Sequence, residues 1–560
     1  MLAEKREWLP AVPLWCILCR QRIAPEWALA ITRIDAAATP WPMRPDGVVR
    51  RPGLETPMTL TELFAKPDPA LAAAVTRLLE RFHRADDSEA PYRREQFCQQ
   101  LDDANMPGEG MDTQAYLARL EQLVPGASHL ASRHYMGHMT APLPAFTGEL
   151  ARLLVMLNQN PMKMESSRLL SFLEREVLAK LHRLVYRGTD DFYHHQMHAK
   201  DAALGVMTSG GTIANVTALW LARNHAVGDN LFHLVEQGYR GAVILGSRLM
   251  HYSFDKGMDL LGMGAVNVRR LETDADNRLS LPALEAALLE CKALRLKVLA
   301  IIGVAGSTDF GSVDPLAELA DIARRENVHF HVDAAWGGPT LFSPRYQSLL
   351  AGIEQADTVT LDGHKQLLVP LGTGMLLCKR PDLVMAVKRE APYAIRASSF
   401  DQGRFTLEGT RPANALYLDG AFQLLGETGY RTLIEANYAK ARCMAALIDA
   451  DPAFELMSAP VMNLLSYRCI PPHLQGKTLN KAANEQINLF NVALQKAQRA
   501  EGHSFVSRTQ RPLHRYGDQP LVLLRAVLLN PQIEESDIRD LLADQTRLGL
   551  SVAAELFTDE

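Results

Sequence analysis

Short runs of apolar residues recur through the middle of the chain, and each predicts a buried β-strand. The run at 328–333 alternates polar and apolar residues and is rich in β-branched residues, and this run and the one at 357–361 end in polar, turn-forming residues. A similar run lies at 242–246, a further strand is expected at the glycine-rich segment 205–212, and apolar segments compatible with helices, such as 213–223, lie between the runs. This alternation of strands and helices predicts an α/β fold.

Helical periodicity dominates both ends of the chain. Apolar positions between 60 and 79 and over 116–123 fit amphipathic helices. Toward the C-terminus we expect a long helix over 414–450, strands over 462–468 and 521–528, and a final helix over 534–547. These patterns divide the chain into four parts: residues 1–57, a helical segment (58–129), a large domain (130–415) and a small C-terminal domain (416–560). Residues 1–57 are either a poorly ordered extension or a stretch included because the start of translation is assigned too far upstream.

Two charged residues follow the strand-like runs of the large domain. Asp333 lies in Val-Asp-Ala-Ala-Trp-Gly-Gly at 332–338, and Lys365 ends Asp-Gly-His-Lys at 362–365. Open α/β sheets bind ligands beyond the carboxyl ends of their strands. There an amine can bond to the aldehyde of pyridoxal 5'-phosphate (PLP), and a carboxylate can keep the pyridinium nitrogen of PLP protonated. Taken alone, an aspartate or a lysine after a strand is usually a solvated turn residue or a helix cap.

A glycine turn and a histidine strengthen the cofactor interpretation. Gly210, Gly211 and Thr212 lead into an apolar helix, whose N-terminal N–H groups suit a phosphate, although such a turn also occurs without a ligand. His251 follows the run at 242–246, where an imidazole can stack on the cofactor ring and contact a substrate carboxylate. The chain holds 17 histidines, so chance can place any one of them there.

Five motifs in order resemble the group II PLP-dependent amino-acid decarboxylases. They are Thr208-Ser-Gly-Gly-Thr212, His251, Val332-Asp-Ala-Ala-Trp-Gly337, His364-Lys365 and Thr406-Leu-Glu-Gly-Thr-Arg411. The resemblance extends over residues 130–530. It implies the type I PLP-dependent transferase fold, with a mostly parallel sheet in the large domain and a smaller α+β C-terminal domain. It also implies a homodimer with active sites at the subunit interface.

The resemblance assigns roles to individual residues. Three are catalytic: Lys365 bonds to the cofactor, Asp333 pairs with the pyridinium nitrogen, and His251 stacks on the ring. The other cofactor-binding residues are Gly210, Gly211 and Thr212 at the phosphate, His364 near the phosphate, Ala335 under the ring, and Thr308. The implied reaction removes carbon dioxide from the α-carbon of an amino acid.

Two further residues point to an acidic substrate. Arg525 lies in a segment, 520–531, that resembles the stretch of glutamate decarboxylases in which an arginine binds the distal carboxylate. The alternative is an outward-facing arginine on an edge strand. His138, in Gly-His-Met-Thr at 137–140, resembles the bacterial PLP-dependent aspartate 1-decarboxylases. We therefore expect conversion of L-aspartate to β-alanine, a pantothenate precursor.

Other functions remain open at this point. Decarboxylation of glutamate to γ-aminobutyrate is the first alternative, and another PLP-dependent lyase or aminotransferase is the second. A catalytically silent PLP-binding subunit is a third possibility. This third possibility is suggested by the segment 395–405, which lacks the loop tyrosine that protonates the carbanion in many members of the family. Tyr393 lies just before this segment. The proton donor is therefore left open.

Composition and charge narrow the class of protein. The chain has 560 residues, of which 47% are hydrophobic and 22% charged, and this length predicts three or four domains, which the family resemblance lowers to three. Its net charge of −5 without a long basic run argues against nucleic-acid binding, and no apolar run reaches the ~18 residues of a membrane helix. Seven cysteines without regular spacing indicate reduced thiols in the cytoplasm. The apolar stretch after Lys5 is broken by Pro10 and Pro13, which argues against export.

No metal site is expected. Cys16 and Cys19 form a single C-x-x-C pair without a second pair. The histidines at 194, 195 and 198 have ligand-like spacing, but we place them in a polar linker and expect them to be solvated.

Overall fold

The computed structural model describes residues 48–49, 58–59, 69–83, 101, 103–391 and 399–557. These residues divide into two units, one drawn from 1–77 and 103–122 and the other from 78–102 and 123–560. Most of the predicted extension over 1–57, including the C-x-x-C pair, lies outside the described residues. The domain boundaries predicted at residues 58, 130 and 416 stay predictions.

The N-terminal elements are short. Strand β1 (Val48–Val49) pairs antiparallel with β2 (Met58–Thr59). Helices α2 (Pro69–His83) and α4 (Thr113–Leu123) overlap the two segments for which amphipathic helices are predicted. Each of these helices buries a single leucine, Leu78 in α2 and Leu117 in α4.

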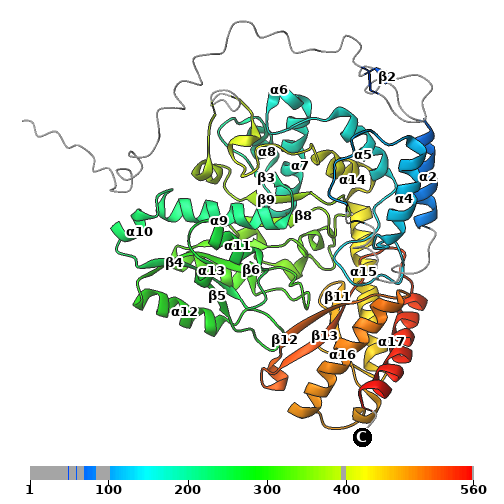
Figure 1. Cartoon of the computed structure of the whole chain (residues 1–560). Helices are drawn as coiled ribbons and strands as arrows, with labels where there is room; N and C mark the ends of the chain where they lie inside the picture. Colours follow the sequence, from blue (N-terminus) through cyan, green and yellow to red (C-terminus); the bar gives the residue numbers. More distant parts are fainter. Residues whose placement is uncertain are drawn as a thin grey trace, which may run out of the picture. The chain divides into compact units, whose positions relative to one another are not determined.

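A seven-stranded sheet forms the centre of the second unit (Figure 1). Its strands are β3 (Gly205–Thr208), β4 (Gly241–Ser247), β5 (Val268–Leu271), β6 (Leu296–Val304), β7 (His329–Asp333), β8 (Thr358–Asp362) and β9 (Gly374–Cys378). Their order is β3-β9-β8-β7-β6-β4-β5. Strand β9 is antiparallel to both of its neighbours, and every other pair is parallel. The carboxyl ends of β3, β7 and β8 therefore lie at one edge of the sheet, and the mostly parallel sheet predicted from the sequence is confirmed.

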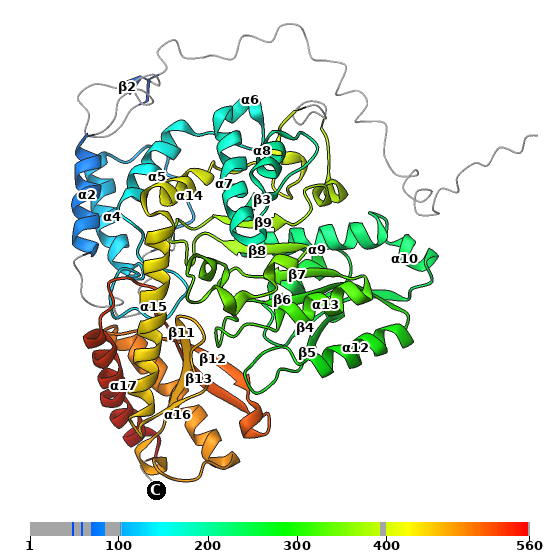
Figure 2. The same ribbon diagram turned by 180° about the vertical axis from the view of Figure 1, so that it is seen from behind.

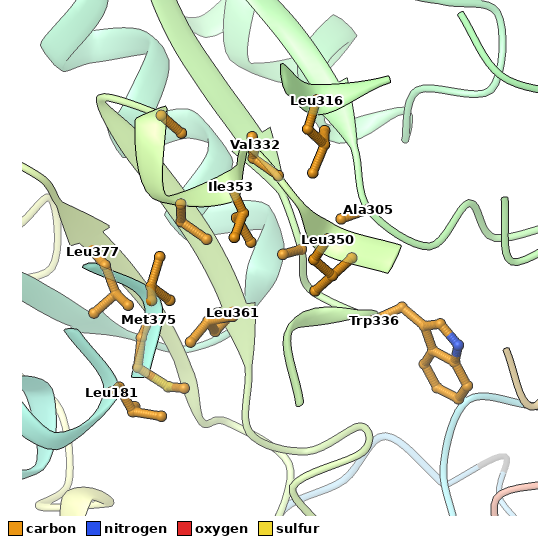
Figure 3. Close-up of a cluster of buried hydrophobic side chains, with 14 of the residues drawn as sticks. Leu181, Ala305, Leu316, Val332, Trp336, Leu350, Ile353, Leu361, Met375 and Leu377 are labelled. Atoms are coloured by element: carbon orange, nitrogen blue, oxygen red, sulfur yellow. The ribbon is translucent and has the colours of Figure 1, made fainter. Parts of the chain in front are cut away.

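Helices cover both faces of this sheet. One face packs against α7 (Leu169–Tyr186), α12 (Leu281–Ala293) and α13 (Leu316–Glu326), and the other against α9 (Gly211–Val227) and α11 (Ser253–Leu260). Figure 3 shows the apolar core of the first face, where Leu181 of α7 lies near Met375 of β9. Strands buried on both faces have near-continuous apolar sequences, which explains the runs that predicted them.

The remaining helices of this part of the chain are α5 (Phe146–Leu157), α6 (Met164–Ser167), α8 (Asp190–His198) and α10 (Phe232–Glu236). Helix α8 corrects one prediction, because the histidines at 194, 195 and 198 lie on a helix and not in a linker. The Thr189 hydroxyl accepts a hydrogen bond from the N–H of Phe192 and caps this helix. All three histidines are exposed, as predicted.

A smaller antiparallel sheet follows (Figure 2). Its strands are β10 (Phe454–Leu456), β11 (Leu464–Cys469), β12 (Ser507–Pro512) and β13 (Pro520–Val527), in the order β10-β11-β13-β12. It packs against α15 (Gly426–Asp449), α16 (Lys481–Glu501) and α17 (Glu535–Leu556). The mixture of helices and antiparallel strands is the α+β arrangement that was predicted.

The single helix predicted over 414–450 is wrong. The segment forms two helices, α14 (Ala415–Leu424) and α15, which meet at Leu425. Gly426 has a φ of +63°, in the left-handed region that interrupts a right-handed helix. Within the described residues, no helix is both long and apolar enough to span a membrane.

Candidate active site

A cavity of about 310 Å³ opens at the carboxyl edge of the large sheet. It brings together all nine residues predicted to bind the cofactor: Gly210, Gly211, Thr212, His251, Thr308, Asp333, Ala335, His364 and Lys365. These residues lie at the carboxyl end of β7, in the turns after β3, β4, β6, β7 and β8, and in the first turn of α9, segments that are far apart in the sequence. The sheet therefore gathers the predicted residues at the edge where open α/β sheets bind ligands.

Asp333 is the last residue of β7, and its carboxylate is held by two hydrogen bonds. One oxygen, Oδ2, accepts from the side-chain amide of Asn215 at 2.9 Å, and Oδ1 accepts from the N–H of Ala335 at 3.1 Å. The residue is 8% exposed and lines the cavity. A carboxylate fixed in this way can receive a hydrogen bond from a ring N–H of a ligand in the cavity.

Lys365 lies in the turn that follows β8, close to the carboxylate of Asp362. Its ammonium nitrogen, Nζ, is 3.8 Å from Asp362 Oδ2, which also accepts a hydrogen bond from the N–H of Gly211 at 3.1 Å. The other oxygen, Asp362 Oδ1, lies 2.8 Å from Nδ1 of His364. One buried carboxylate thus joins the glycine turn to the turn that carries the lysine.

The glycine turn between β3 and α9 leaves room for an anion. Gly210 has a φ of +154° and offers no side-chain cap to the first turn of α9. A Cβ atom at Gly211 would lie 3.0 Å from Asp362 Oδ2, so a larger residue would crowd the turn. The N–H of Gly211 donates to Asp362 and that of Ser209 to Glu408, so a phosphate would be drawn to this turn by the positive end of the 17-residue helix α9.

His251 lies between β4 and α11 and lines the same cavity. Burial lowers the pKa of its imidazole; the charge of Asp333 opposes this effect and that of Lys365 adds to it. Its Nδ1 atom accepts a hydrogen bond from the N–H of Ser253 at 3.2 Å. The neutral imidazole therefore carries its proton on Nε2 and can donate it to a ligand.

The two residues predicted to bind the substrate lie beside the cavity and do not line it. Arg525 is on β13, an interior strand between β11 and β12, so the edge-strand alternative is wrong. Its guanidinium donates to the carbonyl oxygens of Thr308 and Gly137, at 3.0 and 3.2 Å, and to the hydroxyl of Ser507 at 2.9 Å. Because Thr308 lines the cavity, Arg525 is tethered to its wall.

His138 follows Gly137 and precedes Met139, another residue of the cavity wall. Its ring centroid lies 5.6 Å from that of Phe505, and the residue is exposed. Its ring is partly withdrawn from water, and this partial burial and the charge of Arg525 lower the pKa of the imidazole. His138 is thus near Arg525 and keeps a neutral ring more readily than a free histidine does.

The fifth sequence motif also contacts the glycine turn. The carboxylate of Glu408 accepts a hydrogen bond from the N–H of Ser209 at 3.0 Å, and Arg411 pairs with the buried Glu174. Tyr393 and residues 395–398 of the segment 395–405, which lacks a tyrosine, lie outside the described residues.

Sequence reasoning missed Asn215 and Asp362 as partners of the cavity residues. Asn215 is a polar residue within the apolar segment 213–223, and this contrast is a signal in the sequence. Asp362 belongs to the Asp-Gly-His-Lys motif, but a cofactor-binding role was predicted only for the histidine and the lysine of this motif. In the part of the chain that the structure describes, no three residues are grouped as metal ligands.

The profile of the pyridoxal-dependent decarboxylase conserved domain matches residues 96–470. The chain belongs to this family. It is 42% identical to an aspartate 1-decarboxylase of Aliivibrio fischeri, over 77% of this chain and 82% of that protein. An L-2,4-diaminobutyrate decarboxylase of Rhizobium meliloti is 31% identical, over 64% and 69%. A mouse cysteine sulfinic acid decarboxylase is 28% identical, over 70% and 77%.

Solved structures agree on the fold. A structure of mouse CSAD in apo form has a TM-score of 0.76 at 24% identity and covers 86% of this chain and 99% of its own. A structure of Oryza sativa TDC with PLP and tryptamine has a TM-score of 0.76 at 19% identity and covers 89% and 100%. The type I PLP-dependent fold is therefore confirmed.

Family membership makes the protein a PLP-dependent amino-acid decarboxylase, a carboxy-lyase. This confirms the predicted cofactor and favours decarboxylation over transamination or a silent cofactor-binding subunit. The cavity suits PLP, because it combines an amine at Lys365, a fixed carboxylate at Asp333 and a glycine turn at a helix N-terminus.

Proposed function

We propose that the protein decarboxylates L-aspartate at its α-carbon and releases β-alanine, a precursor of pantothenate. The observation that carries the proposal is the 42% identity to the aspartate 1-decarboxylase of Aliivibrio fischeri over 82% of that protein. The arginine tethered beside the cavity supports a substrate with a second carboxylate. Decarboxylation of glutamate to γ-aminobutyrate is the alternative.

Each cavity residue has a role in this proposal. Lys365 would hold the resting cofactor covalently, the glycine turn with Thr212 and His364 would bind its phosphate, and Asp333 would keep its ring nitrogen protonated. When bound, PLP would accept the electron pair that the departing carbon dioxide leaves behind. His251 would stack on the ring and donate a hydrogen bond from its Nε2–H to the ionised α-carboxylate of the substrate. A cationic imidazole would stabilise the ionised α-carboxylate of the bound substrate and so raise the barrier to its loss as carbon dioxide. A neutral His251 orients this carboxylate without that added stabilisation.

Arg525 binds the distal carboxylate of the substrate in this proposal. A guanidinium has five N–H donors, and three of those of Arg525 are used on Thr308, Gly137 and Ser507. Two N–H groups are left, one on each terminal nitrogen, which suits the two oxygens of a carboxylate. Because the tethers fix the guanidinium, its position selects the length of the acid.

The proposed assembly is a homodimer in the cytoplasm. Helix α5 exposes Val155 and Met156, which are 72% and 80% exposed, and Leu169 at the start of α7 is 76% exposed. Exposed apolar residues on neighbouring elements are typical of a subunit interface. The four cysteines that the structure describes, Cys291, Cys378, Cys443 and Cys469, are free thiols, in line with a reducing compartment.

Product analysis with two substrates tests the proposal. The PLP-loaded protein is incubated with equal concentrations of aspartate or glutamate, and β-alanine and γ-aminobutyrate are quantified. We expect kcat/KM for aspartate to exceed that for glutamate by about tenfold or more, since a fixed guanidinium penalises a misplaced methylene. Faster turnover of glutamate would favour the alternative, and no product from either acid would refute the proposal.

Two arginine variants locate the specificity site. Arg525→Ala is expected to lower kcat/KM for aspartate about 100-fold and to abolish the preference for a second carboxylate, because a charge-assisted pair is lost. Arg508→Ala on the adjacent β12 is the control, since Arg508 is exposed and donates to the carbonyl oxygen of Val492. Unchanged selectivity in Arg525→Ala would place the specificity site elsewhere.

A further inference from the structure

Polar residues line one face of two central strands of the large sheet. His329, His331 and Asp333 alternate along β7 with Phe330 and Val332, so the three polar side chains share a face. On β8, the residue paired with His331 is Thr358. All of these residues are buried, and apolar clusters pack on both faces of the sheet around them. Buried polar groups at this position require a complete set of hydrogen bonds.

Hydrogen bonds connect these residues to the carboxylate of Asp333. The side-chain nitrogen of Asn215 lies 2.9 Å from Asp333 Oδ2 and its oxygen lies 3.2 Å from Nε2 of His331. Nδ1 of His331 is 2.9 Å from the hydroxyl of Thr358, and that hydroxyl is 2.8 Å from Nε2 of His329. The contacts therefore form a continuous chain from the cavity through β7 and β8.

The chemistry of the carboxylate fixes the direction of every bond in this chain. An ionised Asp333 only accepts, so Asn215 must present its NH₂ group to it and its oxygen to His331. His331 must then donate from Nε2, which leaves Nδ1 as an acceptor. The hydroxyl proton of Thr358 is consequently given to His331, and Thr358 accepts in turn from Nε2 of His329. No donor or acceptor in the chain is in conflict.

The two imidazoles remain neutral, as this pattern requires. Burial lowers the pKa of His331 to about 3 and that of His329 to about 4, with the charges of Asp333 and Asp357 opposing the effect. The second N–H of the Asn215 amide is also occupied, by the hydroxyl of Ser253 at 3.0 Å. We call this series of hydrogen bonds, from Asp333 through Asn215, His331 and Thr358 to His329, the relay. Its donors and acceptors are matched while both histidines are neutral, which makes the relay a rigid support for Asp333.

We propose that Asn215, His331 and Thr358 are positioning residues that fix and polarise the Asp333 carboxylate for the pyridinium nitrogen of PLP. Asn215 lines the cavity and contacts the Asp333 carboxylate directly, whereas His331 and Thr358 do not line the cavity and act on Asp333 through Asn215. The inference rests on the family's cofactor and not on the identity of the amino acid, so it stands whether aspartate or glutamate is the substrate.

A pair of substitutions on one strand separates this role from general packing. Thr358→Val removes the hydroxyl that links the two histidines and keeps the shape of the side chain. Thr360→Val is the matched control, because Thr360 is also fully buried on β8 and its hydroxyl has no hydrogen-bond partner among the described residues. Thr358→Ser keeps the hydroxyl and is the rescue variant.

The readouts are the dissociation constant of PLP for the apoprotein, the absorbance maximum of the bound cofactor and the unfolding midpoint of the apoprotein. We expect Thr358→Val to raise the dissociation constant about tenfold, similar to the loss of metal affinity when a residue that hydrogen-bonds to a metal ligand is mutated. We also expect the absorbance maximum of the bound cofactor to shift. Thr358→Ser and Thr360→Val should stay within about twofold of the wild type. A change in the unfolding midpoint alone would indicate a structural role and would overturn the proposal.

A second variant keeps the test decisive if Thr358→Val does not fold. Asn215→Ala breaks the relay at its first link and places a good helix former within α9. The same weakening of PLP binding and the same direction of spectral shift are expected. PLP binding and absorbance equal to those of the wild type would overturn the proposal.

Discussion

His329 and His331 combine burial with low imidazole pKa values, about 4 and about 3. In the unfolded chain the pKa of each imidazole is about 6.5. Below that pH the unfolded chain binds protons that the folded protein does not, so acid favours unfolding. The stability that the neutral histidines contribute is therefore fully present above about pH 6.5, and it is lost as the pH falls toward about 4.

A variant of His329 measures this contribution. Between about pH 7 and about pH 5.5, the free energy of unfolding of the wild-type apoprotein should fall by about 1 kcal/mol more than that of His329→Gln. Burial raises the pKa of Asp314 to about 7, which acts in the opposite direction but is common to both proteins. Urea denaturation at the two pH values gives the comparison, and an equal fall in both proteins would show that His329 titrates normally.

At the scale of elements, the junction of α14 and α15 depends on one glycine. Gly426 has a φ of +63°, and no atom lies within 4 Å of the position a Cβ would take. The cost of a side chain there is therefore purely conformational. It arises because an L-residue is strained in the left-handed region.

Two alanine substitutions in open space should act in opposite directions. Gly426→Ala should destabilise the protein by about 1 kcal/mol because of its positive φ. Gly148→Ala also meets no atom within 4 Å, but it lies within helix α5, where alanine should stabilise by up to about 1 kcal/mol. Thermal unfolding of both apoproteins compares them, and a stabilising Gly426→Ala would contradict the described junction.

The strands that position the site follow from local sequence patterns, whereas two features elsewhere in the chain were predicted wrongly. The strands ending at Asp333 and Asp362 were predictable because they are short, alternate polar and apolar residues and end in turn-forming residues. The break at Gly426 was not, since a glycine is tolerated within a helical pattern and only its φ decides. Helix α8 could have been found from Thr189 and the two acidic residues that follow it, a typical helix start.

The partners of the site were harder to predict than its principal residues. Asn215 and Asp333 are 118 residues apart, and only the packing of α9 on the sheet brings them together. The tethering of Arg525 likewise depends on Gly137, 388 residues away. A single sequence shows which residue types are present, but it does not show which distant partners complete their hydrogen bonds.

At the scale of the whole molecule, the proposed homodimer can be tested against one chain's mass of 62.0 kDa. Light scattering should give about twice this mass, because exposed apolar residues on α5 need a covering surface. Val155→Glu should shift the protein toward the monomer by burying a charge at the interface. Val235→Glu on α10 is the control, since Val235 is 70% exposed and Val155 is 72% exposed. A monomeric wild type with full activity would contradict the proposed assembly.

The most direct test of the account is to reduce the PLP-loaded protein with borohydride and map the labelled peptide. Reduction fixes the cofactor on the amine that holds it, and we predict a single phosphopyridoxyl group on Lys365, the lysine that lines the cavity. Label on a different lysine, or a wild-type protein that stays colourless after reconstitution, would contradict the site described.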